Sequence, residues 1–514
     1  MTIALLLVVA VVVIAPIAAV LASAGWGPRT DTSGTIAIGW NPILFTKTLG
    51  WAGLIAALAT SLALPCGWFA GRRGLWVSVL GCMLLLLPMY LASSGWGLIR
   101  APGTMVGDLL ERLTEGERRW IPIAVNRGLA IAGLAMWATP LAMLVIAGSV
   151  RRVPIAAEEA LRLDATSWLH AAVQRMRMIK GGIVGGFVLV LLVMLGSAVP
   201  LHLAQIETYS TKLWLMLDES SQAEKWKVWV SAWPLFLVAA AGGLILRRLA
   251  RDVDIEIIEG GSQKRGIGFW LSLAVIGFGV AVPLVSFAMS IHRLSSFETV
   301  WQTSREAALT SVSVAGVCGA LGMLLAAWVA SGQVGRKTQI LAIVGFGVMA
   351  LVPGVLVGGA VAALWRGGPR WLNETWLIVV LAHFARFGVV GVLTGIFAAR
   401  SESVSEQEMR RLEGGEGIVG WLQACLPWQW GILAAGGLAI GALSFQEIEA
   451  SIMVTPPGVE SLAREMLQHL HFARTEELSV TSVMVVSTGL VIAGIAARLA
   501  VLGCRKHGQT MQRR

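Results

Sequence analysis

Residues 49–71 read LGWAGLIAALATSLALPCGWFAG, a stretch without a single charged side chain. An α-helix needs about 20 predominantly apolar residues to cross the hydrocarbon core of a bilayer. Residues 309–332, LTSVSVAGVCGALGMLLAAWVASG, have the same character, and Trp328 stands near their end as Trp68 does in the first stretch. The two stretches predict membrane-spanning helices and an internal repeat.

The composition of the whole chain excludes a soluble fold. Hydrophobic residues make up 56% of the sequence and charged residues 14%, with a mean hydropathy of +0.74, whereas soluble domains have about 45–50% and 25%. Because any fold of 514 residues keeps a large surface, the solvent for much of that surface must be lipid. The net charge of +10 fits the Lys and Arg of cytoplasmic loops. We therefore expect membrane lipid, and not nucleic acid, as its partner.

The apolar segments predict an all-α polytopic membrane protein of about twelve transmembrane helices in two six-helix halves, 1–250 and 251–514. Pro88 and Pro353 lie in the third helix of each half. Six is an even number, so the halves form a parallel repeat, with a transport pathway expected between them. The expected helices are 3–24, 45–70, 75–99, 123–150, 181–203, 227–247, 268–291, 306–331, 338–365, 374–398, 429–446 and 478–503.

Charge and cysteine usage complete this outline. The larger share of Lys and Arg falls on alternate loops, beginning with Arg72 and Arg73, which places both termini in the cytoplasm. The five cysteines are scattered without metal-ligand spacing, so we expect neither a disulfide framework nor a metal site. The sequence contains no complete phosphate-binding loop, so we expect no ATP hydrolysis by this chain alone.

Two charged loops, 151–180 and 399–427, follow the fourth helix of each half and have helical character. In the first loop, which we expect to begin its helix at Pro154, Glu158 and Glu159 come early, where the helix dipole favours acids. In the second loop, Ser405 and Glu408 have the spacing of a capping box. On these residues alone, the acids could equally serve only as dipole partners on solvated loops.

These two loops resemble the coupling loop of binding-protein-dependent ABC importer permeases, in which Glu-Ala-Ala is followed by Gly and later by Leu-Pro. In the second loop Glu408 matches the Glu, Gly414 the Gly, and Leu426 and Pro427 the Leu-Pro pair. The first loop departs further from this pattern. Its matching positions include Glu158, Glu159, Ala160 and Asp164, the last standing where the family has Gly, and Arg177 stands where it has Pro. Residues 450–466, 207–216 and 87–90 also resemble segments of fused iron(III) and thiamine permeases.

The resemblance implies a type I importer-like permease of the bacterial inner membrane. Its loops would dock on a cytoplasmic ABC ATPase dimer, which binds ATP and Mg²⁺, while this chain binds no cofactor. A periplasmic solute-binding protein would deliver a small solute, with iron(III) favoured and thiamine next. Two alternatives stay open, namely a secondary transporter driven by an ion gradient and a degenerate membrane scaffold.

Three ionisable residues stand in or beside apolar segments of the second half. His383 and Arg386 fall inside the expected helix 374–398, and Glu447 follows the end of helix 429–446. Ionisable groups inside a span are costly and point to function by default. For His383 and Arg386 we expect either a buried structural pair or a part of the translocation path. For Glu447 we expect either a place in the outer vestibule of that path or simple interfacial solvation.

Overall fold

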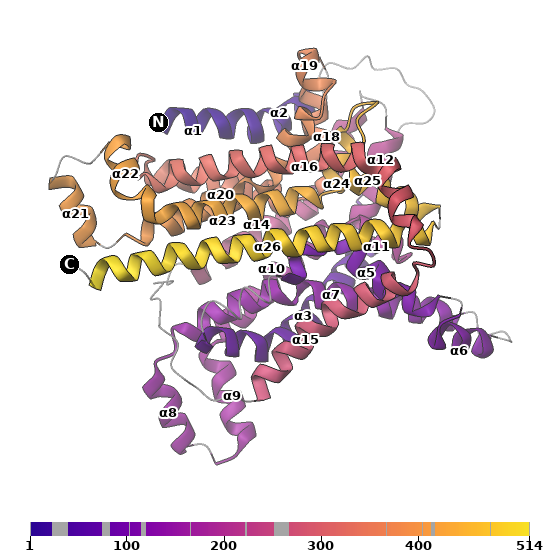
Figure 1. The fold of residues 1–514 in the computed structure, drawn as a ribbon, viewed down its shortest axis with the longest axis horizontal. Coiled ribbons are helices and arrows are strands. Elements are labelled where there is room, and N and C mark those ends of the chain that lie inside the picture. The colour runs from indigo at the N-terminus through magenta and orange to yellow at the C-terminus, as the bar shows by residue number, and fades with distance from the viewer. Residues whose placement is uncertain are drawn as a thin grey trace. The chain divides into compact units, whose positions relative to one another are not determined.

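The computed structural model is helical throughout the part of the chain that it describes, with no β-strand there (Figure 1). The described residues are 2–22, 40–73, 83–101, 103–114, 120–164, 166–220, 224–250, 267–365, 367–402, 404–412, 417–472 and 474–512. The chain divides into two compact units. The terminal unit contains Met1–Gly39, Leu213–Trp233 and His292–Arg514, and the middle unit contains Trp40–Lys212 and Pro234–Ile291.

The elements of the middle unit are α3 (Pro42–Arg73), η3 (Met83–Leu86), α5 (Met89–Gly97), η4 (Leu98–Arg100), α6 (Met105–Thr114), α7 (Trp120–Arg151), α8 (Ile155–Asp164), α9 (Trp168–Met178), α10 (Lys180–Gly196), α11 (Val199–Leu203) and α15 (Ile267–Met289). Two further helices, α12 (Tyr209–Glu219) and α14 (Trp233–Ala250), run across the boundaries of the units.

The terminal unit begins with α1 (Thr2–Val9), the π-helical turn η1 (Ala10–Ile14) and α2 (Ala15–Ala22), and includes α13 (Lys225–Ser231). Its other helices are α16 (Ser295–Ala330), α17 (Arg336–Leu351), α18 (Gly354–Trp365), α19 (Arg370–Asn373), α20 (Leu377–Arg400), α21 (Val404–Leu412), α22 (Ile418–Ala424), α23 (Leu426–Phe445), α24 (Glu449–Val454), α25 (Leu462–His471) and α26 (Thr475–Gln512).

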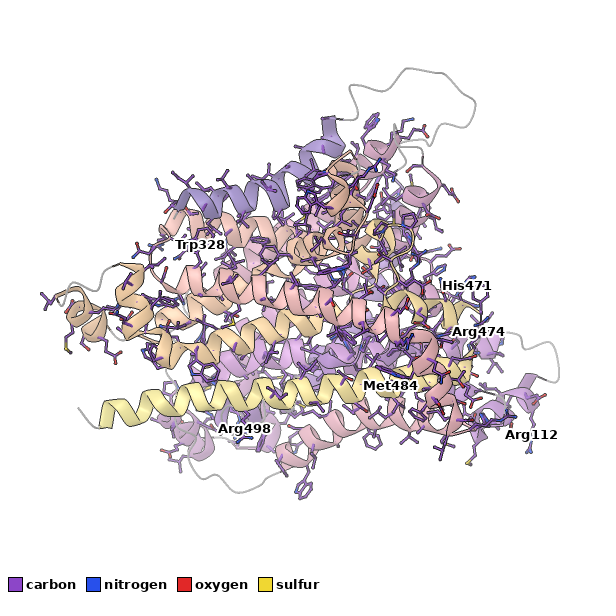
Figure 2. All side chains as sticks on the ribbon, turned by 45° about the horizontal axis from the view of Figure 1, so that its top comes forward. Arg112, Trp328, His471, Arg474, Met484 and Arg498 are labelled. Atoms are coloured by element: carbon purple, nitrogen blue, oxygen red, sulfur yellow. The ribbon has the colours of Figure 1, made fainter. Side chains whose placement is uncertain are left out.

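Seven described helices are long and apolar enough to cross a membrane, and three bent helix pairs raise the number to ten if each pair is one span. Two of the twelve expected spans are not among them. Part of 75–99 lies outside the described residues, and 478–503 belongs to α26, on which Figure 2 shows Arg498. An all-helical fold with at least seven candidate spans is thus confirmed, and the twelve-helix repeat stays a prediction.

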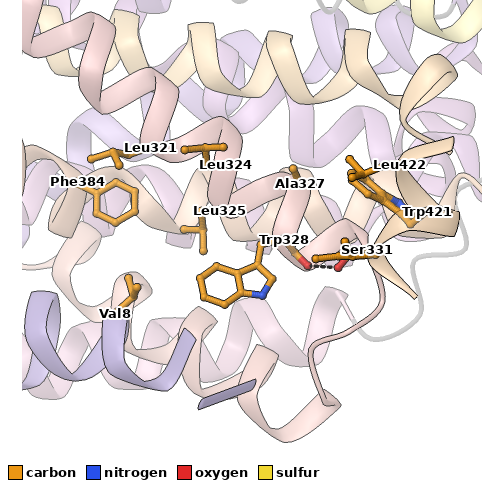
Figure 3. Close-up of a pocket in the computed structure, with 11 residues that line it drawn as sticks. Val8, Leu321, Leu324, Leu325, Ala327, Trp328, Ser331, Phe384, Trp421 and Leu422 are labelled. Atoms are coloured by element: carbon orange, nitrogen blue, oxygen red, sulfur yellow. Dashed lines mark hydrogen bonds between the residues drawn. The ribbon is translucent and has the colours of Figure 1, made fainter. Parts of the chain in front are cut away.

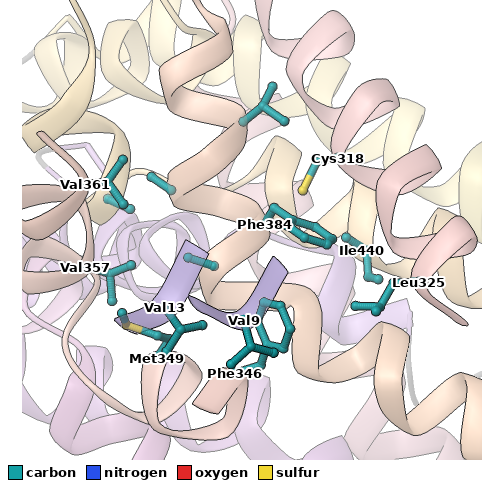
Figure 4. Packing of buried hydrophobic residues seen from close by; sticks show 14 of the residues in the cluster. Val9, Val13, Cys318, Leu325, Phe346, Met349, Val357, Val361, Phe384 and Ile440 are labelled. Carbon is teal, nitrogen blue, oxygen red and sulfur yellow. The ribbon is translucent and has the colours of Figure 1, made fainter. Parts of the chain in front are cut away.

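The N-terminal segment packs with a helix more than 300 residues later in the sequence. Val9 and Val13 share a buried cluster with Phe346 and Met349 of α17 (Figure 4). In the middle unit, α15 packs on α3 and α5, and an added Cβ at Gly95 would lie 2.6 Å from the Pro283 side chain. The compact units therefore do not coincide with the sequence halves 1–250 and 251–514, although this does not test the duplication itself.

Close helix approach in the terminal unit depends on paired glycines. An added Cβ at Gly319 of α16 would lie 2.7 Å from the carbonyl oxygen of Gly437 in α23, and one at Gly437 would lie 2.9 Å from that of Gly319. Small residues let helix backbones approach in membranes, where packing replaces the hydrophobic effect. The contact therefore fixes the distance between α16 and α23.

We expect Gly319→Ala to lower the apparent melting temperature of the detergent-purified chain, because the methyl group overpacks this contact at a cost of about 1–3 kcal/mol. Gly316→Ala, on the same helix, is the control, because nothing lies within 4 Å of its added Cβ. Size-exclusion chromatography after heating measures both. Equal melting temperatures for the two variants would contradict the packing role of Gly319.

Candidate functional site

A break between α17 and α18 creates a site for a carboxylate. The axes of α17 and α18 differ by 112° across Val352 and Pro353. Proline removes a helical hydrogen bond and clashes with the preceding turn, so α18 begins anew at Gly354. The Gly354 N–H donates to Glu449 Oε2 at 3.3 Å. The acid thus satisfies a free amide and complements the positive end of the α18 dipole.

Arg386 of α20 joins this acid to a second one. Its guanidinium donates to Glu447 Oε1 and to Glu449 Oε2, the latter from Nη2 at 3.4 Å. The three side chains are 13%, 8% and 5% exposed. Buried charges persist only when they are paired and hydrogen-bonded, and two carboxylates against one guanidinium leave one formal negative charge near the α18 N-terminus.

His383 continues the network one turn earlier on α20. Its Nδ1 lies 2.7 Å from Ser444 Oγ, and its Nε2 lies 2.8 Å from Ser451 Oγ. Ser451 Oγ already donates to the Glu447 carbonyl oxygen at 2.8 Å, so it accepts the Nε2 proton, and Nδ1 accepts from Ser444. Both ring nitrogens are then satisfied in the neutral tautomer. The network joins α18, α20, α23 and α24 in one unit.

In the middle unit, the break at Pro88 between η3 and α5 is closed without charge. Trp137 precedes Arg151 at the end of α7 by as many residues as Arg386 precedes Arg400 at the end of α20. The Trp137 indole donates to the Leu87 carbonyl oxygen at 2.7 Å, directly before Pro88. The charged network is therefore a feature of the terminal unit and not of this position in the middle unit.

The first loop is held at its base by Glu158. This acid is 8% exposed and lies 3.0 Å from Arg72 Nη2 of α3 and 3.9 Å from Arg175 Nη2 of α9. Both guanidinium carbons lie 5.7 Å from the ring centroid of Trp68. Arg72 also donates to the Val153 carbonyl oxygen at 3.0 Å. Glu158 thus links α8 to the end of the candidate span α3. An acid that only complemented the helix dipole would not need these two arginine partners.

In the second loop the acid that forms the anchoring ion pair is Glu402 and not Glu408. Glu402 accepts two hydrogen bonds from Arg410, at 2.9 Å from Nε and 3.1 Å from Nη2, and the Cys425 thiol donates to it at 3.5 Å. Glu408 is exposed. The predicted position of the capping box is wrong, because α21 already begins at Val404 and Ser405 lies inside it.

The remaining predicted loop residues lie on the surface or outside the description. Glu159, Ala160 and Asp164 are exposed on α8, whose first turn follows Pro154 and does not include it. Leu426 and Pro427 form the first turn of α23, and Gly414 falls outside the described residues. The sequence analysis did not identify Glu402 and Arg410 as site residues. The features that could have indicated them are an acidic residue beside the end of an apolar helix and a basic residue eight positions later.

Large apolar side chains are exposed at the tips of both loops. Leu163 and Trp168 are 87% and 81% exposed between α8 and α9, and Leu412 is 88% exposed at the end of α21. Figure 1 shows α8 and α9 as two short helices that project from their unit. Exposed apolar groups that cluster at a projecting tip mark an interaction surface.

The candidate spans define the class of protein: an all-helical, multi-pass membrane protein. In the part of the chain that is described, no three His, Cys, Asp or Glu residues are grouped to hold a metal ion.

Comparison with known proteins gives a more particular likeness. The chain is similar to proteins described as putative 2-aminoethylphosphonate transport system permease protein PhnV, from Salmonella typhimurium, Salmonella choleraesuis and Salmonella typhi. Each is 30% identical over 170 residues, which are 30% of this chain and 60% of the relative. The chain thus covers less than two thirds of the length of these curated relatives. No protein-family model and no solved structure matches the chain.

We expect Arg386→Met to destabilise the protein strongly, because two carboxylates would stay buried without their partner, at a cost of about 3–5 kcal/mol. The apparent melting temperature in detergent measures this loss. Arg370→Met is the matched control, since Arg370 is 90% exposed. A melting temperature for Arg386→Met that equals the control would show that the ion pairs do not hold α20 to Glu447 and to α24.

The Cys425 thiol gives a pH-dependent test of the second loop. Burial and then the neighbouring Glu402 carboxylate raise the pKa of Cys425 to about 12. Maleimides react with thiolates, so we expect labelling of a variant with Cys425 as its sole cysteine to rise about tenfold per pH unit from pH 7 to 10. Leu412→Cys in a chain without other cysteines is the control, and its rate should level near pH 9. A plateau near pH 9 for Cys425 would contradict its burial beside Glu402.

Proposed function

We propose that this chain is the membrane-spanning permease of an ATP-driven importer. The observation that carries the proposal is the 30% identity over 170 residues to a putative transport system permease protein. The two projecting loops support it, because each follows a candidate span in the same order of helix, short helix, short helix and next span.

The loop tips are the proposed contact with the ATPase. Leu163, Trp168 and Leu412 offer exposed apolar groups, and a helix that seats in a partner's groove binds through such anchors. Glu158 and Glu402 act behind this surface as positioning residues, because their ion pairs tie each loop to the end of a span. When ATP binding draws the two ATPase subunits together, the tips transmit the movement and the pathway alternates its access.

The proposed partners are a cytoplasmic ABC ATPase dimer, which carries ATP and Mg²⁺, and a periplasmic solute-binding protein. The proposed location is the bacterial inner membrane with both termini in the cytoplasm. The cargo is a small solute. The resemblance in the sequence favours iron(III) and then thiamine, whereas the relatives' description names 2-aminoethylphosphonate. Uptake assays with these three solutes decide among them.

A second candidate is a carrier driven by an ion gradient, which the buried network of His383, Arg386, Glu447 and Glu449 favours, since ion-coupled carriers place such groups in their spans. Solute uptake by the chain alone in proteoliposomes, driven by a proton or sodium gradient without ATP, would select this carrier over the importer.

We expect Leu163→Glu and Leu412→Glu to abolish copurification of the ATPase and its ATP hydrolysis. A charge at an apolar contact must be desolvated without a partner, while exposed positions leave the fold unchanged. Leu294→Glu, at a position 86% exposed outside the loops, is the control. Affinity purification with ATPase assay measures all three. A chain that binds no ATPase even without substitutions would overturn the importer proposal.

A further inference from the structure

A hydrophobic cavity lies within the terminal unit, beside the end of α16. Its volume is about 510 Å³, and its wall includes Leu321, Leu324 and Trp328 of α16 (Figure 3). Val8 of α1 faces it from the other side, and Leu422 of α22 closes one end. Besides the indole N–H groups of Trp328 and Trp421, the polar group of the wall is the Ser331 hydroxyl, which donates to the Trp328 carbonyl oxygen at 2.7 Å. The cavity therefore fits an apolar group and offers almost nothing to a polar one.

The cavity opens on a surface that faces lipid. Leu324, in the last third of the candidate span Ser295–Ala330, is 65% exposed, and Leu422 is 44% exposed. From Leu321 to Ser331 the wall follows α16 for ten residues, or about 15 Å at 1.5 Å per residue. This length matches the hydrocarbon depth of one leaflet, which is half of about 30 Å.

Basic side chains gather where this wall ends. Arg336 and Lys337 begin α17 directly after the turn that follows Ser331, and both are exposed. An added Cβ at Gly391 of α20 would lie 2.9 Å from the Gly322 carbonyl oxygen of α16, and α20 runs from there to the exposed Arg400 at the same end. Basic groups at the end of an apolar groove between spans suit a lipid headgroup.

We propose that this cavity binds one acyl chain of an anionic phospholipid, with the headgroup beside Arg336, Lys337 and Arg400. The occupant touches α1 and α22 together. It therefore links the first helix of the sequence to the segment that follows α21. Binding needs neither the solute nor an ATPase, so the site stands whether or not the proposed transport activity is correct.

Quenching of tryptophan fluorescence by brominated lipid tests the site, because Trp328 lines the cavity. The full chain, stripped of lipid in detergent, is titrated with phosphatidylglycerol that carries brominated acyl chains. We expect saturable quenching at about one probe per chain. Trp328→Phe should weaken this component, because Trp421 then remains as the second tryptophan of the wall, whereas Trp301→Phe, on the same helix but outside the cavity, should leave it unchanged. Quenching that never saturates, or that is the same in both variants, would overturn the proposal.

Two further variants distinguish the contribution of the acyl chain to binding from that of the headgroup. Ala327→Phe fills the cavity and should abolish the saturable component. Arg336→Gln with Lys337→Gln alters only exposed side chains and should raise the probe concentration for half-maximal quenching by about fivefold per residue, since each base near a lipid surface contributes about 1 kcal/mol. Arg370→Gln is the control. Equal saturation by brominated phosphatidylcholine, or a copurified apolar molecule that is not a lipid, would overturn an anionic phospholipid as the occupant.

Discussion

A polar group inside a bilayer has no water to bond, so it must find its partner within the protein. The break between α17 and α18 depends on this constraint. Pro353 ends one helix and exposes the first amides of the next, and Glu449 satisfies that of Gly354. The acid then needs Arg386, and Arg386 accommodates Glu447 as well. One interrupted helix thus accounts for the charged network around it.

The two loops achieve the same anchoring with opposite polarity. In the first, the acid Glu158 lies on the short helix α8 and the base Arg72 at the end of a candidate span. In the second, the acid Glu402 directly follows the span and the base Arg410 lies on the short helix α21. An ion pair between the span and the short helix constrains the loop in either arrangement, with the acid on the short helix and the base on the span or the reverse. Conserving the pair therefore does not require conserving the motif.

The sequence was sufficient for the helical class, because the need for about twenty apolar residues per span is visible in composition alone. It located His383 and Arg386 inside a span, but their partners come from helices that only folding brings together. It favoured Glu408 over Glu402 because a motif records chain spacing and not burial. The packing of α1 with α17 also escaped prediction, since apolar residues carry no mark of the helix they contact.

The packing of α1 and α2 on α17 and α18 has a consequence for synthesis. Helix α1 leaves the ribosome well before α17 and α18, whose sequences end at Trp365. At about 5–20 residues per second, it waits about 20–70 s for them. During that time Val9 and Val13 lack Phe346 and Met349 as packing partners, while the whole of the middle unit is being made. Helix α1 therefore meets these partners only after the whole of the middle unit, which ends at Ile291, has been synthesised.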